Sequence, residues 1–66
     1  MIAYIYLDTG ITVEARQESG TQMDAAELAN EILRDINTRG VVCLPNGDDY
    51  VLVNAEKISF IRVSDE

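Results

Sequence analysis

An acidic residue, a small hydroxyl residue and a glycine end the first apolar run of the sequence, at Asp8-Thr9-Gly10. Two carboxylates that face each other share one proton, so that one can accept a proton from water while the other donates one. A homodimer would supply both carboxylates from a single short chain. The stretch therefore raises the question of peptide hydrolysis at Asp8.

The stretch Leu7-Asp8-Thr9-Gly10 resembles the signature of the aspartic proteases, and of their homodimeric retroviral type in particular. That resemblance implies a homodimeric aspartic peptidase with Asp8 as its catalytic residue. It covers four residues, and the rest of the chain shows neither a flap over a substrate nor the second, helix-proximal segment that these enzymes need. We prefer a hairpin turn, because Asp bonds to the backbone that follows it and Gly accepts a positive φ.

No other set of residues indicates catalysis or a cofactor. The sequence contains no histidine, which removes the usual general base and the commonest zinc ligand. Cys43 lies in an apolar run and is expected to be a small core residue. Asn46, Asp48 and Asp49 lack the spacing of an EF-hand calcium loop. We therefore expect no cofactor, no metal ion and no enzymatic activity.

Length and charge limit the classes of function further. The 66 residues are expected to form one small domain over 1–66, and 12 acidic residues against 5 basic ones give a net charge of −7. Phosphate backbones and anionic membranes attract clustered Lys and Arg, so direct binding to nucleic acid or to a membrane is not expected. The start of the chain lacks the basic region of a secretory signal, and the single cysteine fits a reducing compartment, which together favour the cytoplasm.

The hydrophobic periods predict the order ββαβββ, an α+β fold with one helix. The first two strands are joined by the turn at Asp8, and the helix runs from Thr21 as its N-cap to Arg39, before a stop at Gly40. Three more strands follow, of which the first two are joined by a turn at Pro45-Asn46-Gly47-Asp48. The expected ranges are 2–7, 11–16, 21–39, 41–44, 50–53 and 58–63.

The order and lengths of these elements resemble the β-grasp arrangement of ubiquitin-like domains. That resemblance covers nearly the whole chain and implies a single helix packed on one face of a mostly antiparallel small sheet. A modifier function is not expected, because those proteins end in Gly-Gly and this sequence ends in Asp65-Glu66. A hairpin beside a meander of the last three strands is the alternative topology.

The predicted strands are apolar on both faces, and one helix can cover only one face. The surplus apolar surface must curve inward, meet a second copy or bind a partner, because large exposed apolar patches are rare on soluble monomers. We expect self-association into a homodimer or a higher homo-oligomer. The residues expected at that interface are Tyr4, Tyr6, Tyr50, Leu52 and Phe60.

Four carboxylates lie within about 80° of arc on the polar side of the predicted helix, counted at roughly 100° per residue. They are Asp24, Glu27, Glu31 and Asp35. The row is either a solvated surface or a binding site for Arg and Lys on a basic protein partner.

Two functions fit these features. The preferred one is a small non-enzymatic accessory protein that acts through self-association and protein binding. The alternative is an acidic inhibitor or nucleic-acid mimic, whose helix carboxylates occupy the basic groove of an enzyme. Salt separates the two, because a carboxylate-driven complex weakens as the Debye length shrinks, whereas apolar association survives about 0.5 M NaCl.

Overall fold

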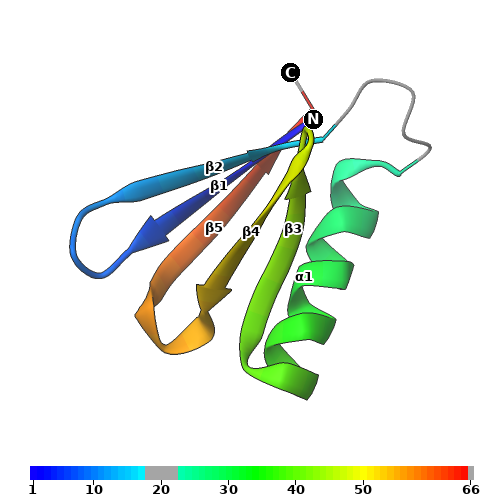
Figure 1. The fold of residues 1–66 in the computed structure, drawn as a ribbon. Coiled ribbons are helices and arrows are strands. Elements are labelled where there is room, and N and C mark those ends of the chain that lie inside the picture. The colour runs from blue at the N-terminus through cyan, green and yellow to red at the C-terminus, as the bar shows by residue number, and fades with distance from the viewer. Residues whose placement is uncertain (18–22, 66) are drawn as a thin grey trace.

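The computed structural model describes residues 1–17 and 23–65 (Figure 1). Within these ranges the strands and helices follow the predicted ββαβββ order, and the α+β class is confirmed. A 3₁₀ turn, η1, joins the last two strands. The elements are β1 (Ile2–Leu7), β2 (Thr12–Arg16), α1 (Ala25–Arg39), β3 (Val41–Asn46), β4 (Asp49–Asn54), η1 (Ala55–Lys57) and β5 (Ile58–Ser64).

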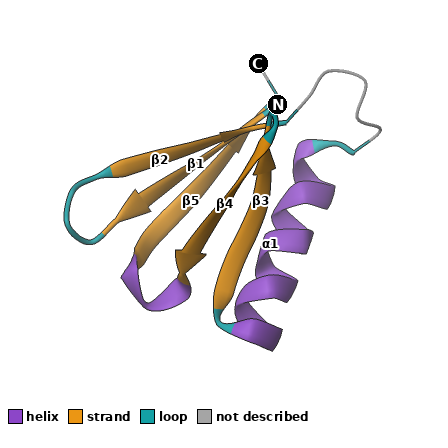
Figure 2. Ribbon diagram, viewed as in Figure 1, coloured by secondary structure: helices purple, strands orange, loops and turns teal. Residues whose placement is uncertain are grey.

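The strands form two antiparallel sheets, and α1 packs against them (Figure 2). In one sheet β1 lies between β2 and β5, so the beginning of β1 and the end of β5 are side by side in Figure 1. In the other sheet β3 pairs with β4, and among the described residues neither of them pairs with a third strand. The meander of the last three strands is therefore not formed, because β5 pairs with β1 and not with β4.

The connection through η1 explains why β5 leaves β4. The backbone N–H of Ala55 donates to the carbonyl oxygen of Gly40 at 2.9 Å, and the N–H of Asp8 donates to the carbonyl oxygen of Lys57 at 2.8 Å. These two bonds hold η1 between the end of α1 and the turn that follows β1. The chain consequently enters β5 beside the end of β1.

The helix begins at Ala25 and not at the predicted start. Asp24 is the N-cap, and its Oδ1 accepts a hydrogen bond from the backbone N–H of Glu27 at 2.9 Å. Glu27 Oε1 accepts in return from the N–H of Asp24 at 3.1 Å, which completes a capping box. Thr21, the predicted N-cap, lies outside the described residues. Gly40 ends the helix as predicted, in the left-handed conformation with φ +73°.

The turn between β3 and β4 is shorter than predicted. Pro45 and Asn46 belong to β3, which leaves Gly47-Asp48 as the loop. Gly47 has φ +62° at the first central position, as a type II′ turn requires. The ring of Pro45 is tolerated in β3 because this strand lies at an edge of its sheet.

One hydrophobic core joins both sheets and the helix. Ile5 on β1 and Val42 on β3 are its largest fully enclosed side chains, each 0% exposed. Since β1, β3 and α1 all contribute, neither sheet has a core without the other. The buried members of this core are Ala3, Ile5, Ala15, Leu28, Ile32, Val42, Leu44 and Val53.

Truncating this core should destabilise the whole chain. We expect Ile5→Ala to lower the free energy of unfolding by about 2–5 kcal/mol, because burial is lost and a cavity remains. The matched control is Ile11→Ala, at a position that is 60% exposed, with an expected change within about 0.5 kcal/mol. Urea unfolding followed by circular dichroism measures both, and equal losses would contradict this assignment of the core.

Candidate functional site

The Asp-Thr-Gly stretch forms the exposed turn between β1 and β2, as preferred from the sequence. Gly10 has φ +93°, and its N–H donates to the carbonyl oxygen of Leu7 at 3.0 Å. Asp8 lies exposed in this turn, and its backbone N–H is the group that bonds to η1. The stretch thus has a structural use, and the expectation that Asp8 is not catalytic stays a prediction.

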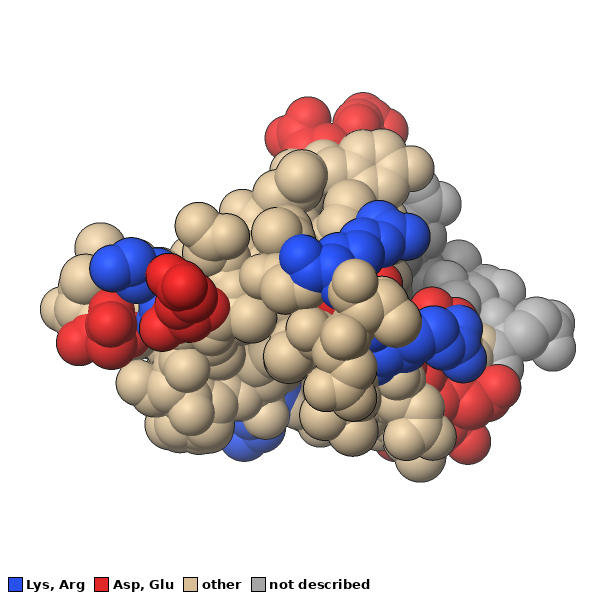
Figure 3. Space-filling model, turned by 90° about the horizontal axis from the view of Figure 1, so that it is seen from below, with Lys and Arg blue, Asp and Glu red and all other residues tan. Residues whose placement is uncertain are grey.

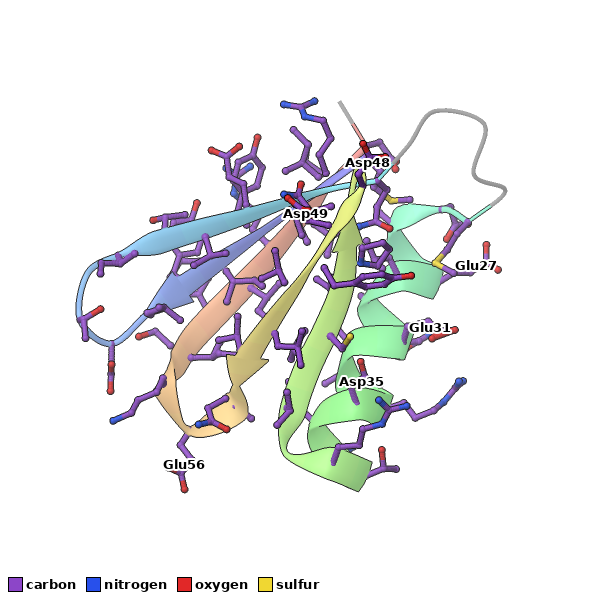
Figure 4. The ribbon with its side chains drawn as sticks, in the orientation of Figure 1. Glu27, Glu31, Asp35, Asp48, Asp49 and Glu56 are labelled. Atoms are coloured by element: carbon purple, nitrogen blue, oxygen red, sulfur yellow. The ribbon has the colours of Figure 1, made fainter. Side chains whose placement is uncertain are left out.

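The described residues offer no clustered metal ligands. Nowhere in ranges 1–17 and 23–65 do three His, Cys, Asp or Glu side chains gather so that they could hold an ion. Figure 4 shows Asp48 and Asp49 at the β3–β4 turn, and Glu27, Glu31 and Asp35 along the helix. The thiol of Cys43 is half-buried and not in a disulfide.

Every carboxylate of the predicted helix row has a partner within the chain. Asp24 and Glu27 form the capping box described above, and Glu31 Oε1 lies 3.8 Å from Arg34 Nη1. Asp35 Oδ2 accepts a hydrogen bond from the backbone N–H of Cys43 at 3.3 Å, which ties the helix to β3. Three of the four carboxylates therefore contribute to the helix or to its packing.

Three of the residues predicted for self-association lie together on one face of the three-stranded sheet. The register places Tyr6 opposite Phe60 and Tyr4 opposite Arg62. The rings of Tyr6 and Phe60 stack with centroids 4.3 Å apart and planes inclined by 15°. The guanidinium carbon of Arg62 is 4.4 Å from the centroid of the Tyr4 ring. We call Tyr4, Tyr6, Phe60 and Arg62 the aromatic cluster.

Arg62 connects the two halves of this aromatic cluster. Its Nη2 donates to the hydroxyl oxygen of Tyr6 at 3.4 Å, at the long end of such bonds. This hydrogen bond is the main cause that raises the pKa of Arg62 above its ordinary value, so the guanidinium stays charged. A permanent cation over an aromatic face is a favourable arrangement.

The other two predicted residues lie in the other sheet. Tyr50 and Leu52 are on β4, opposite Pro45 and Cys43 of β3, and they are 68% and 67% exposed. The predicted set is thus divided between two sheets, which the sequence could not reveal without the strand pairing.

Sequence reasoning missed an apolar groove between α1 and β5. Its volume is about 480 Å³, and none of the described residues that line it is charged. Leu33 of the helix is 55% exposed there. Phe60 also borders the groove, but its ring stacks on Tyr6 on the other face of the sheet. Figure 3 shows, from one side, that most acidic side chains in that view lie at its margins, with uncharged surface and several basic side chains between them. The lining includes Leu33, Ile36, Ile58, Phe60, Ile61 and Val63.

β5 borders this groove as an edge strand. It pairs with β1 on one side, and no described strand pairs with its other side. The ladder to β1 is irregular at Ser59, because Tyr6 pairs with Phe60 whereas Leu7 pairs with Ile58. Edge strands of soluble proteins are commonly protected by charged side chains, Pro or bulges. β5 contains no Lys or Pro, but it carries Arg62 and the irregularity at Ser59. Among the described residues, its outer backbone groups pair with no other strand.

Comparison of the chain with models of known protein families, with curated proteins and with solved structures finds no match. Within the described residues, no helix combines the length and the apolar character that crossing a membrane needs. The groove and the free edge of β5 are therefore the features from which a function can be argued.

The capping box predicts unequal roles within the acidic helix row. We expect Asp24→Ala to lower the free energy of unfolding by about 0.5–2 kcal/mol, because the N-cap bond is lost. Glu31→Ala is the control, with an expected change within about 0.5 kcal/mol, since its partner Arg34 is solvent-exposed. Thermal unfolding measures both variants. A greater loss for Glu31→Ala would contradict the structural role of Asp24.

Proposed function

We propose that this chain is a small non-enzymatic accessory protein that self-associates, and binds other proteins, through the groove between α1 and β5. The observation that supports it is a groove whose described lining residues carry no charge, in a chain of net charge −7. The free edge of β5 beside the groove adds unpaired backbone groups to the same surface. We place it in the cytoplasm, because a single cysteine fits a reducing compartment.

Charge favours a second copy at this surface. Two chains of net charge −7 repel each other, and they meet at least cost where each carries the fewest carboxylates. Among the described residues, the lining of the groove carries none. Raising the salt concentration shortens the Debye length from about 8 Å at physiological ionic strength to a few ångströms, which weakens the general repulsion. Self-association at the groove should therefore strengthen with salt or stay unchanged.

A dimer interface of standard size would be large for this small chain. A standard interface buries about 800 Å² on each partner. The described chain exposes 4409 Å², so such an interface would take roughly one fifth of it. Leu33 would contribute most, because burying a large apolar side chain stabilises by about 1.5–3 kcal/mol.

The acidic inhibitor or nucleic-acid mimic remains the alternative. A basic partner that engaged the helix row would compete with the capping box and with the bond from Cys43 to Asp35. No contact in the described residues favours this function over self-association, and high salt would weaken it.

The test is the solution mass by light scattering at about 0.05 M and 0.5 M NaCl, across a dilution series. We expect a dimer at both salt concentrations. Leu33→Gln should raise the dimer dissociation constant about tenfold or more, because about 1.4 kcal/mol is tenfold and a buried leucine contributes at least that much.

The matched control is Leu52→Gln, the same change at an exposed position of β4 outside the groove lining. It should leave the dissociation constant within about twofold, well under 1 kcal/mol. If only Leu52→Gln weakened the dimer, the interface would lie at β4 and not at the groove. A monomer at both salt concentrations would rule out self-association.

A further inference from the structure

We infer that two copies of the chain pair their β5 strands edge to edge, antiparallel, about a two-fold axis that passes beside Ile61. The inference rests on the proposed self-association and specifies its geometry. The product is one continuous six-stranded sheet in the order β2-β1-β5-β5-β1-β2, in which the free edges of both β5 strands are paired.

The groove and the free edge favour an extended strand as the occupant. A strand that lies along β5 makes backbone hydrogen bonds on one side and buries side chains against the groove, as in strand addition generally. β5 has seven residues and alternates half-buried Ile61 and Val63 with exposed Phe60 and Arg62. With the core-facing residues of both copies on the same side of the new sheet, the partner's Ile61 and Val63 reach the wall formed by Leu33 and Ile36.

The register follows from three constraints on β5. Residues directly opposite each other in an antiparallel ladder lie on the same face, so the axis must fall on a residue. An axis at Arg62 would set two guanidinium groups directly opposite each other, which is destabilising. An axis at Phe60 would place the irregular residue Ser59 beside the axis, where it would interrupt the ladder. An axis at Ile61 avoids both.

With the axis at Ile61, Phe60 lies opposite the partner's Arg62, and this pair occurs twice. A guanidinium beside an aromatic ring is attractive, and Arg62 already packs on Tyr4 while Phe60 stacks on Tyr6. The aromatic clusters of the two copies would thus join across the axis. Arg62 is also the sole charged residue of β5, so no carboxylate meets another in this ladder.

The free edge of β4 is a weaker candidate for self-pairing. β4 begins at Asp49, and Asp48 precedes it in the turn (Figure 4). Two copies paired through β4 would bring the Asp49 carboxylates within the strands to the interface of an already acidic protein, whereas β5 itself contains no carboxylate.

Cysteine cross-linking tests the register. In a Cys43→Ser background, the variants Phe60→Cys and Arg62→Cys are mixed and oxidised with oxidised glutathione. Directly opposite Cα atoms are about 4.5–5.5 Å apart, within the reach of a disulfide, whereas diagonal neighbours are about 7–8 Å apart. We expect the mixed disulfide to form at least tenfold faster than the dimer of either variant alone, on a non-reducing gel read by mass spectrometry.

The other outcomes are distinguishable. Faster cross-linking of Phe60→Cys with itself would overturn the register at Ile61. A dimer by light scattering that yields no disulfide in any mixture would overturn the pairing of β5 and leave the proposed self-association standing. A monomer by light scattering would overturn both, and would leave the edge of β5 to a strand from another protein.

Hydrogen exchange on the unchanged protein gives an independent reading, since the two cysteine variants alter the aromatic cluster itself. Amides in 58–64 should exchange at least tenfold more slowly at a concentration where the chain is dimeric than after dilution. Amides in 12–16, on the opposite edge of the same sheet, serve as the control and should slow much less, because they gain only the general stabilisation of the fold. Protection confined to 12–16 or to 49–54 would overturn the pairing of β5.

Discussion

The antiparallel pairing of β5 with β1 is the interaction on which the rest of the structure depends. It joins the last strand to the first, and it places Ile61 and Val63 opposite Ile5 and Ala3 in the core. It also sets Phe60 beside Tyr6 on the other face. The same pairing draws β5 away from β4, which opens the groove and leaves one edge of β5 free. Core, aromatic cluster, groove and free edge are thus consequences of one strand register.

Local patterns predicted the elements well, because each is specified by neighbouring residues. The run from Ile2 to Leu7 and the stop at Gly40 were found where the structure has them. The start of the helix was missed because two overlapping signals compete there. The side chain of Glu27 is long enough to reach back to the backbone N–H of Asp24, which completes a capping box. The prediction had placed the N-cap at Thr21 with Asp24 as the third residue of the helix, where the shorter Asp side chain would have to reach back.

Pairing between distant segments could not be predicted in the same way. The alternation of β1 placed Tyr4 and Tyr6 on one face, but whether Phe60 or Tyr50 would join them depended on which strand lies beside β1. That choice is made by the bonds of Ala55 and Asp8 to residues far along the chain. No short sequence pattern predicts these bonds. The residues predicted for the interface therefore lie in two different sheets, and the groove was not predicted.

Folding and association are coupled in a chain of this length. A domain of about 60 residues buries only about 60% of the surface that its unfolded chain exposes, so its own core leaves little margin of stability. Here the helix shares its apolar side between β3 and the groove, where Leu33 remains exposed. A partner that fills the groove binds the folded chain and not the unfolded one, so it also stabilises the fold. The open groove thus lowers the stability of the isolated chain, and the same groove provides the apolar surface to which a second copy would bind.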